Sequence, residues 1–556
     1  MTNSTTRAHF ALISMTVLLL AFSGSVNAAT DPLKAPKGSK FRPLSATSEV
    51  MSNRGNQAGV QDSKTPSKLE CRASGDPSAN VNLDCDGILP NNEPQIAVDP
   101  TDPDHMVSSS NDYQSCCDEF YTTFDGGRTW RTGNISVEAP GKKRRTGSDP
   151  VTAFDRKHGV VIHSSLNFQN DGCDGDVVVS ISSDGGLHWN TVVEVADAGG
   201  PTECSDNGLF LDKEWITTDN NPNSSFYGRT YVTWTAFETV SGVTTESPIF
   251  EAHSDDGGLS WTSPHEISGS NPSLCTFQAD GPAGQCDEDQ FSVPTVAPNG
   301  TVYVSFINDQ NQALWEPDEV FDDQYLVVKS TNGGATWSTP VMIAALEDGS
   351  RDFPLNRDGR QTLTNYQLRA PITGNLVADP TQNGRLYFTF FDNRNGVHDV
   401  DDPVTNTDVF LTKSTNGGST WTTPTQVNAA GTGAGNDQWF PWVDVDPTNG
   451  TVGVVYNDRK YDAGHDTYGA TLSESPAGGG NFSGQQLTTA ASHARESVFF
   501  QAGPTVPGCE TCTRFHGDYI GLAYGSDGKA NAVWTDMRDL YAPAGLYLQF
   551  VYFAAR

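Results

Sequence analysis

The chain has few basic residues for its length. Its 556 residues include 34 Lys and Arg against 68 Asp and Glu, so the formal net charge is -34 at pH 7. A surface of that charge repels nucleic acids and anionic membranes at long range. Helical periodicity is nearly absent, and no stretch after residue 22 approaches the roughly 18 uninterrupted apolar residues of a membrane span. We therefore expect a soluble protein that binds neither nucleic acid nor membrane.

Sequence motifs for cofactors are also missing. The chain has no phosphate-binding glycine loop, no zinc motif and no nucleophile elbow, so no organic cofactor is implied. Acidic runs at 99–104 and 399–402 offer oxygen ligands for a structural calcium ion, although such runs are also typical of solvated turns. We therefore expect no cofactor, with structural calcium as the one alternative.

The first residues are typical of an export signal. Arg7 precedes an apolar run at 10–22, and small residues suitable for cleavage end at Ala28, which predicts a signal peptide over 1–28. We therefore expect a secreted monomer, extracellular or periplasmic. Ten cysteines agree with an oxidising compartment, and three close spacings suggest local disulfides. These pairs are Cys71/Cys85, Cys275/Cys286 and Cys509/Cys512.

One short pattern occurs five times after a polar extension over 29–91. It consists of Ser or Thr, then Asp or Asn, two glycines and a Trp three residues later. The Asx side chain and the paired glycines predict a tight turn between antiparallel strands, with the Trp opening the next strand. The Asx residues are Asp125, Asp184, Asp256, Asn332 and Asn416, and the tryptophans are Trp130, Trp189, Trp261, Trp337 and Trp421.

The repeats predict an all-β propeller over 92–556. Each unit supplies four antiparallel strands, and seven units open at similar positions along the chain. The seventh ends after its third strand, so a strand from the extension is expected to complete it and close the ring. We predict seven blades, with six as the alternative. The openings lie near Pro94, Pro150, Trp215, Pro294, Pro371, Pro441 and Tyr519.

The five repeated turns resemble the Asp-boxes, or BNR repeats, of the sialidase superfamily. The resemblance covers about residues 92–553 and implies the propeller fold. It also implies a secreted glycan-active hydrolase similar to exo-α-sialidases, which removes terminal anionic sugars from a glycan or polysaccharide. Polysaccharide lyases and non-catalytic propellers that bind glycans or proteins carry similar repeats, so fold similarity alone leaves the reaction open.

The resemblance also implies candidate catalytic residues. Tyr519 matches the sialidase nucleophile, which is a neutral group that avoids repulsion by the substrate carboxylate. Asp112 matches the acid/base, and Glu214 or Glu238 matches the glutamate that assists the tyrosine. One departure is that Glu93 occupies the position of the first-blade arginine of sialidases.

Three arginines follow second strands at equivalent positions: Arg394, Arg459 and Arg538. Guanidinium groups bind carboxylates in a bidentate manner, so these arginines could bind an anionic sugar. Each arginine also lies next to an Asp, and local pairing that stiffens the rim is an equally good interpretation. For a lyase, His516 near Tyr519 would abstract a proton beside a uronate carboxylate held by Arg538.

Overall fold

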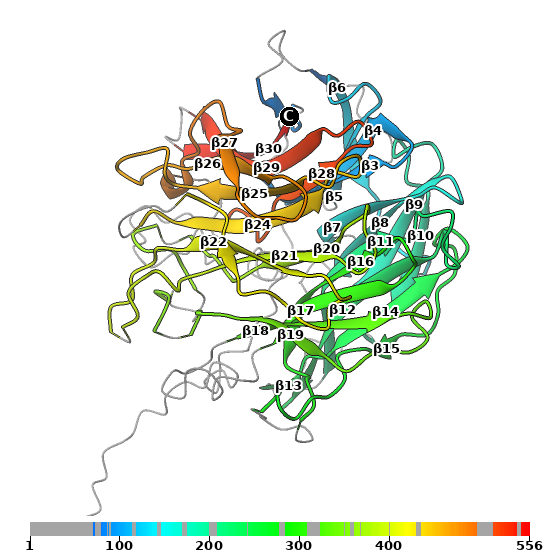
Figure 1. Ribbon diagram of the computed structural model, residues 1–556. Coiled ribbons are helices and arrows are strands. Elements are labelled where there is room, and N and C mark those ends of the chain that lie inside the picture. Colours follow the sequence, from blue (N-terminus) through cyan, green and yellow to red (C-terminus); the bar gives the residue numbers. More distant parts are fainter. Residues whose placement is uncertain are drawn as a thin grey trace, which may run out of the picture.

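The structure is a computed structural model that describes residues 70–556, except 73–78, 86, 88–89, 114–117, 142–145, 169–174, 200–207, 242, 277–283, 309–322, 350, 356–360, 367, 400, 430–434, 497–514 and 542–545. The predicted signal peptide, Cys509 and Cys512 lie outside these residues. The described strands form seven antiparallel sheets arranged around a central axis (Figure 1). The fold is a seven-bladed β-propeller, as the repeats predicted.

Four-stranded sheets are the repeating unit of the ring. In blades 1 to 3 the strands are β3 (Asn91–Asp99), β4 (Asp102–Asp112), β5 (Asp118–Thr123), β6 (Thr129–Ile135), β7 (Thr146–Asp155), β8 (Val160–Phe168), β9 (Asp176–Ser182), β10 (Thr191–Ala196), β11 (Gly208–Thr218), β12 (Thr230–Val240), β14 (Ile249–Ser254) and β15 (His265–Glu266). Blade 1 also has β1 (Glu70–Arg72) at its outer edge, and β13 (Val243–Glu246) pairs with β12 in blade 3.

The remaining blades repeat this plan. Their strands are β16 (Asp289–Val296), β17 (Val302–Asn308), β18 (Gln324–Ser330), β19 (Val341–Ala345), β20 (Gly374–Ala378), β21 (Leu386–Asp392), β22 (Asp408–Ser414), β23 (Thr425–Gln426), β24 (Gln438–Val445), β25 (Val452–Asp458), β26 (Gly469–Ser475), β27 (Ser483–Gln486), β28 (Gly521–Tyr524), β29 (Ala530–Tyr541), β30 (Leu546–Ala555) and β2 (Val81–Asn82). A short 3-10 helix, η1 (Ala494–Glu496), is the one helical element among the described residues. The described residues contain no helix that is long and apolar enough to cross a membrane.

The blades pack face to face, which buries both faces of their middle strands. Strands β9, β17, β21 and β25 are buried over their whole length. The innermost strand of each blade contacts that of the next, and β28 of blade 7 contacts β3 of blade 1. The ring is therefore closed, and side chains at equivalent positions of the innermost strands surround one axis.

Segments before residue 92 join the two ends of the ring. Strand β2 pairs with β30 and completes blade 7, while β1 pairs with β6 of blade 1. A disulfide between Cys71 and Cys85, with Cα atoms 5.4 Å apart, connects these two segments. The predicted closing strand is thus present, and part of the region expected to be a linker belongs to the propeller.

The five repeated turns fix each blade to the preceding one. In the first turn, Asp125 Oδ1 accepts hydrogen bonds from the backbone N–H groups of Arg128 and Thr129, at 3.0 and 2.9 Å. Both glycines of all five turns have positive φ. A Cβ atom at Gly127 would lie 2.3 Å from the Phe553 ring of blade 7, so glycine is required for close packing as well as for its φ.

The second predicted disulfide, Cys275–Cys286, is also present, with Cα atoms 5.3 Å apart.

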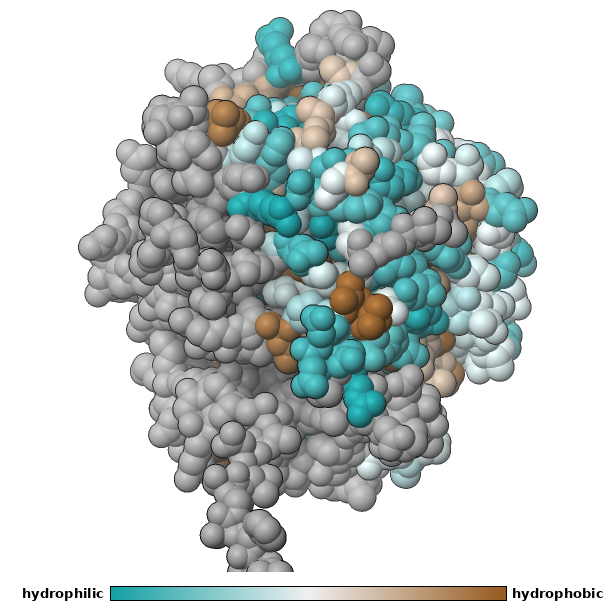
Figure 2. Space-filling model, turned by 90° about the vertical axis from the view of Figure 1, so that its left-hand side faces the viewer, coloured by the Kyte–Doolittle hydropathy of each residue, from teal (hydrophilic) through white to brown (hydrophobic). Residues whose placement is uncertain are grey.

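On the face drawn in Figure 2, the described surface is mainly hydrophilic, and its hydrophobic patches are small and separate. A large apolar docking surface is therefore not found on the described part of that face.

Candidate active site

The innermost strands of five blades share a strained backbone conformation. In each of these strands one non-glycine residue has positive φ, and around that residue the pairing with the second strand of the blade is irregular. A non-glycine residue with positive φ costs on the order of 1 to 3 kcal/mol and persists only where its surroundings require it. The irregularity therefore gives one residue of each of these blades an equivalent position in its innermost strand. The residues are Glu93 (55°), Asp149 (58°), Lys213 (51°), Phe291 (53°) and Phe440 (51°).

Buried charges meet at three of these positions. Lys213 Nζ lies 3.6 Å from Glu93 Oε1, 3.5 Å from Asp149 Oδ1 and 3.6 Å from Asp518 Oδ2. These four residues come from blades 3, 1, 2 and 7, and Arg369, just before blade 5, donates to Asp518 Oδ2 at 2.8 Å. We call these five residues, together with Glu214 and Tyr519, the axial cluster. All seven side chains are at most 2% exposed.

Glu214 and Tyr519 are the members of the axial cluster that the sequence singled out. The Tyr519 ring packs edge-on against Trp215, with ring centres 5.1 Å apart, and Lys213 Nζ lies 5.0 Å from the centre of its ring. Neither the Tyr519 hydroxyl nor either carboxylate oxygen of Glu214 has a hydrogen-bond partner among the described residues. Buried polar atoms are nearly always paired, so these groups are marked as candidates for contact with water or a ligand.

Burial and neighbouring carboxylates change the acidity of this centre. Burial, followed by the charges of Glu93 and Asp149, raises the pKa of Tyr519 well above its usual value. Burial and Asp149 likewise raise the pKa of Glu214 well above the usual range. Burial opposes the charged form of Lys213, but the surrounding carboxylates outweigh it and raise its pKa. Lys213 is therefore a cation throughout the physiological range, whereas Glu214 holds its proton more firmly than an exposed glutamate.

Aromatic rings fill the axis beside the axial cluster. Trp215 stacks on Trp442 with ring centres 4.8 Å apart, although blades 3 and 6 are not neighbours in the ring. Phe291 and Tyr519 extend this aromatic group, with ring centres 6.2 Å apart. These rings pack next to Lys213 and Tyr519 and lower the local dielectric constant, which strengthens the electrostatic interactions of the charged groups.

A second buried pair connects blades 1 and 2. His163 Nε2 lies 2.9 Å from Asp118 Oδ2, and both side chains are fully buried. Burial raises the pKa of Asp118, and the charge of Asp118 acts in turn on both Glu214 and Tyr519. This pair could not be predicted from the sequence, because each residue belongs to a buried strand that carries no motif.

Asp112 and Glu238 lie outside the axial cluster. Asp112 ends β4, and its Oδ2 accepts a hydrogen bond from Asn134 on β6 at 3.0 Å. Its neighbour Asn111 donates to Glu93 Oε2 at 2.8 Å, so Asp112 is next in the chain to a residue that contacts the axial cluster. Glu238 is exposed near the end of β12. Of the two glutamates proposed to assist Tyr519, only Glu214 is a member of the axial cluster.

Each of the three rim arginines pairs with an aspartate. The pair Arg394–Asp392 has an N–O distance of 2.5 Å, Arg459–Asp437 has 2.6 Å and Arg538–Asp536 has 2.5 Å. Each guanidinium also lies over an aromatic ring, at 4.2 to 4.5 Å from the nearest ring centre. Arg394 and Arg538 thus take the neighbouring aspartates that the sequence suggested, whereas Arg459 takes Asp437 and not the adjacent Asp458. These contacts support the interpretation in which the arginines stiffen the rim.

His516 has partners at both ring nitrogens. Its Nε2 accepts from the Trp439 indole N–H at 3.1 Å, and its Nδ1 lies 2.9 Å from the Tyr468 hydroxyl. Burial lowers the pKa of His516 to about 3. These contacts give His516 a structural role and do not support the lyase alternative, in which it acts as the base beside Arg538.

No protein-family model and no curated protein matches the chain. Solved structures similar to it include sialidases, enzymes of the superfamily that the repeated turns resemble. A Hadza microbial sialidase is 14% identical over 81% of this chain and 73% of its own, with a TM-score of 0.41. The NanB sialidase from Streptococcus pneumoniae is 8% identical over 81% and 83%, with a TM-score of 0.40. The intramolecular trans-sialidase from Ruminococcus gnavus is 12% identical over 84% and 94%, with a TM-score of 0.37.

Proposed function

We propose that the protein is a secreted glycan-active hydrolase whose reaction centre is the axial cluster. The observation that supports this proposal is that the Tyr519 hydroxyl and the Glu214 carboxyl are both buried without a hydrogen-bond partner among the described residues, and that the charge of Glu214 acts on the pKa of Tyr519. Positive φ at the adjoining positions Glu93, Asp149 and Lys213 adds the backbone strain typical of functional sites.

In the proposed reaction, Tyr519 is the nucleophile. Glu214 must be ionised to act as the base, and its raised pKa makes that form scarcer than in an exposed glutamate. The ionised Glu214 accepts the phenolic proton while the Tyr519 oxygen attacks the anomeric carbon, and the bond to the leaving group breaks with a proton supplied by Asp112. In the second step Asp112 removes a proton from the water that attacks the anomeric carbon, and Glu214 returns its proton to the departing Tyr519 oxygen, so that all three residues regain their starting forms. Proton removal must accompany attack because the raised pKa of Tyr519 makes the free phenolate scarce. Lys213, 5.0 Å from the ring centre, stabilises the negative charge that develops on the phenol.

The proposal includes an expectation for the charge of the substrate. Lys213 and Arg369, the cations of the axial cluster, already interact with Asp149 and Asp518. An anionic sugar would have to compete with these carboxylates, and the rim arginines are also paired. We therefore expect a neutral terminal sugar to be cleaved faster than a sialoside.

The test is hydrolysis of a panel of fluorogenic glycosides that contains a sialoside, a uronide and neutral sugars. We expect turnover of at least one substrate, and a loss of about three orders of magnitude or more in kcat/KM for Tyr519→Phe and for Glu214→Gln. Glu238→Gln is the matched control, because this glutamate is in the same blade but exposed. The kcat/KM of this variant should equal that of the wild type. Circular dichroism and thermal unfolding of each variant separate loss of chemistry from loss of fold.

The burial of Tyr519 and Glu214 favours a second candidate, a non-catalytic propeller that binds glycans. Absence of turnover with every substrate by a folded protein would exclude the hydrolase and support this candidate. Binding to a glycan array that is retained by Tyr519→Phe would then place the binding surface away from the axial cluster.

A further inference from the structure

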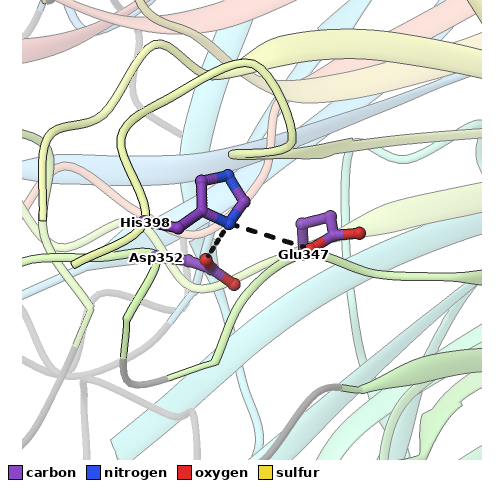
Figure 3. A group of neighbouring side chains, drawn as sticks. All are labelled: Glu347, Asp352 and His398. Atoms are coloured by element: carbon purple, nitrogen blue, oxygen red, sulfur yellow. Dashed lines mark ion pairs between the residues drawn. The ribbon is translucent and has the colours of Figure 1, made fainter. Parts of the chain in front are cut away.

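A group of two carboxylates and one imidazole lies apart from the axial cluster. Glu347 and Asp352 belong to the connection between β19 and β20, and His398 belongs to the loop between β21 and β22 (Figure 3). His398 Nδ1 lies 2.8 Å from Asp352 Oδ1 and 3.9 Å from Glu347 Oε2. One potential ligand atom from each of the three residues lies within 4.8 Å of the other two.

The hydrogen bonding of His398 determines which of its nitrogens faces the carboxylates. Its Nε2 lies 3.1 Å from the backbone carbonyl oxygen of Asn393. A carbonyl oxygen can only accept, so Nε2 carries the proton, and in the neutral ring Nδ1 presents a lone pair to Asp352. Two lone pairs 2.8 Å apart repel each other, so either a proton shared by Nδ1 and Oδ1 or a metal ion must lie between them.

The backbone around Asn393 holds the three side chains in place. The Asn393 N–H donates to the Glu347 carbonyl at 3.1 Å, and its side-chain amide donates to the Asp352 carbonyl. Asp352 Oδ2 accepts from the Gly349 N–H at 2.8 Å, which turns Oδ1 toward His398. A hydrogen bond from the distal nitrogen of histidine to a backbone carbonyl is the usual support of a metal-binding imidazole.

We propose that Glu347, Asp352 and His398 bind a divalent transition-metal ion such as Zn²⁺ or Mn²⁺. An imidazole nitrogen and two carboxylate oxygens suit these ions, whereas Ca²⁺ takes six to eight oxygen ligands. Two ligands of an ion with bonds of about 2.1 Å lie about 3.0 to 4.2 Å apart, so the observed separations need little adjustment. Asp352 is buried while Glu347 and His398 are partly exposed, so an ion can enter and solvent can complete its coordination.

The test is isothermal titration of the full, chelator-treated chain with Zn²⁺, Mn²⁺ and Ca²⁺, each alone. We expect saturable binding of one Zn²⁺ or Mn²⁺ ion per chain, weaker binding of Ca²⁺, and a rise in Tm on addition of the bound ion. Asp352→Asn and His398→Gln should each weaken binding at least tenfold and abolish the rise in Tm. A glycosidase assay is not needed for this readout.

The matched control is His188→Gln. His188 Nδ1 lies 2.5 Å from Asp184, which makes a similar histidine–aspartate pair, but this pair lies in the exposed turn of blade 2. Its removal should leave binding unchanged. Equal affinity of the wild type and the His398→Gln variant would overturn the proposal. Absence of saturable metal binding to the wild type would also overturn the proposal. It would mean that a proton, and not a metal ion, lies between His398 and Asp352.

Discussion

Replacement of Lys213 by Met tests the electrostatic organisation of the axial cluster. Methionine keeps most of the aliphatic volume of lysine but removes the positive charge. In the wild type, that charge lies 3.5 to 3.6 Å from carboxylate oxygens of Glu93, Asp149 and Asp518. Arg369 donates to Asp518, so Glu93 and Asp149 are the carboxylates most affected by the substitution.

The size of the effect follows from these distances. At 3.5 Å and an effective dielectric constant of about 20, each pair of unit charges interacts by about 4 to 5 kcal/mol. Loss of this attraction is partly offset because lysine no longer has to be desolvated and because a carboxylate can take up a proton. We therefore expect Lys213→Met to lower the free energy of unfolding by about 3 to 5 kcal/mol, as is typical when one partner of a buried ion pair is removed.

The loss should depend on pH. Burial already raises the pKa of the Glu93 carboxyl well above the usual value of 4.5, even with Lys213 present. Above pH 4.5 the folded state then binds more protons at Glu93 than the unfolded state does, so this group lowers stability as pH rises. Without Lys213 the pKa of Glu93 rises further, and the difference in stability between wild type and variant should grow from pH 5 to pH 8.

Urea unfolding at several pH values between 5 and 8 measures both effects. The matched control is Lys460→Met, which removes a single partly exposed pair with Asp458 at 2.7 Å and should cost about 1 kcal/mol or less. The double substitution Lys213→Met with Glu93→Gln should recover part of the loss. A loss below about 1 kcal/mol in Lys213→Met, or a difference from wild type that shrinks as pH rises, would refute this account.

Three further predictions concern the ring and its acid stability. Replacing Cys71 and Cys85 by serine should lower the free energy of unfolding by about 3 kcal/mol, measured by urea unfolding, because the pair closes a loop of 14 residues between blades 1 and 7. Gly127→Ala should lower Tm more than Gly418→Ala, because a Cβ has a nearest neighbour at 2.3 Å in the first case and 3.5 Å in the second. His516 should show no titration by NMR above pH 5, because its pKa is lowered to about 3. Between pH 6.5 and 3 the unfolded state then binds more protons at His516 than the folded state does, so stability falls as pH falls. His516→Gln should reduce this loss of stability.

The architecture could be predicted because its signals are local and repeated. The Asx–Gly–Gly turns appear five times, and the glycines have the positive φ that their pattern predicts. The missing fourth strand of blade 7 predicted a closing strand, which the structure places at Val81–Asn82. The pairing of Glu70–Arg72 with blade 1 was not predicted, because a three-residue strand has no periodicity and owes its place to tertiary contacts.

The candidate site could be predicted only in part. Topology places the starts of first strands and the ends of second strands at one end of the propeller, so Tyr519, Glu214 and the rim arginines were all expected there. Sequence position could not show that Glu214 reaches the axial cluster while Glu238 is exposed. It also could not show which partner each arginine takes, since that choice depends on side-chain geometry within a rim loop.

The contrast between blades gives a physical way to recognise functional positions in a repeat protein. Where the repeat has a purely structural task, as in the turns, both the backbone conformation and the residue type recur. At the start of the innermost strands the conformation recurs, with φ between 51° and 58° in five blades, but the residues are Glu, Asp, Lys, Phe and Phe. Glycine would adopt this conformation with little strain, yet it has no side chain to offer. The persistence of strain with charged residues at three of these positions therefore indicates that their side chains are needed at the axis, which is the reason to test the axial cluster before the rim arginines.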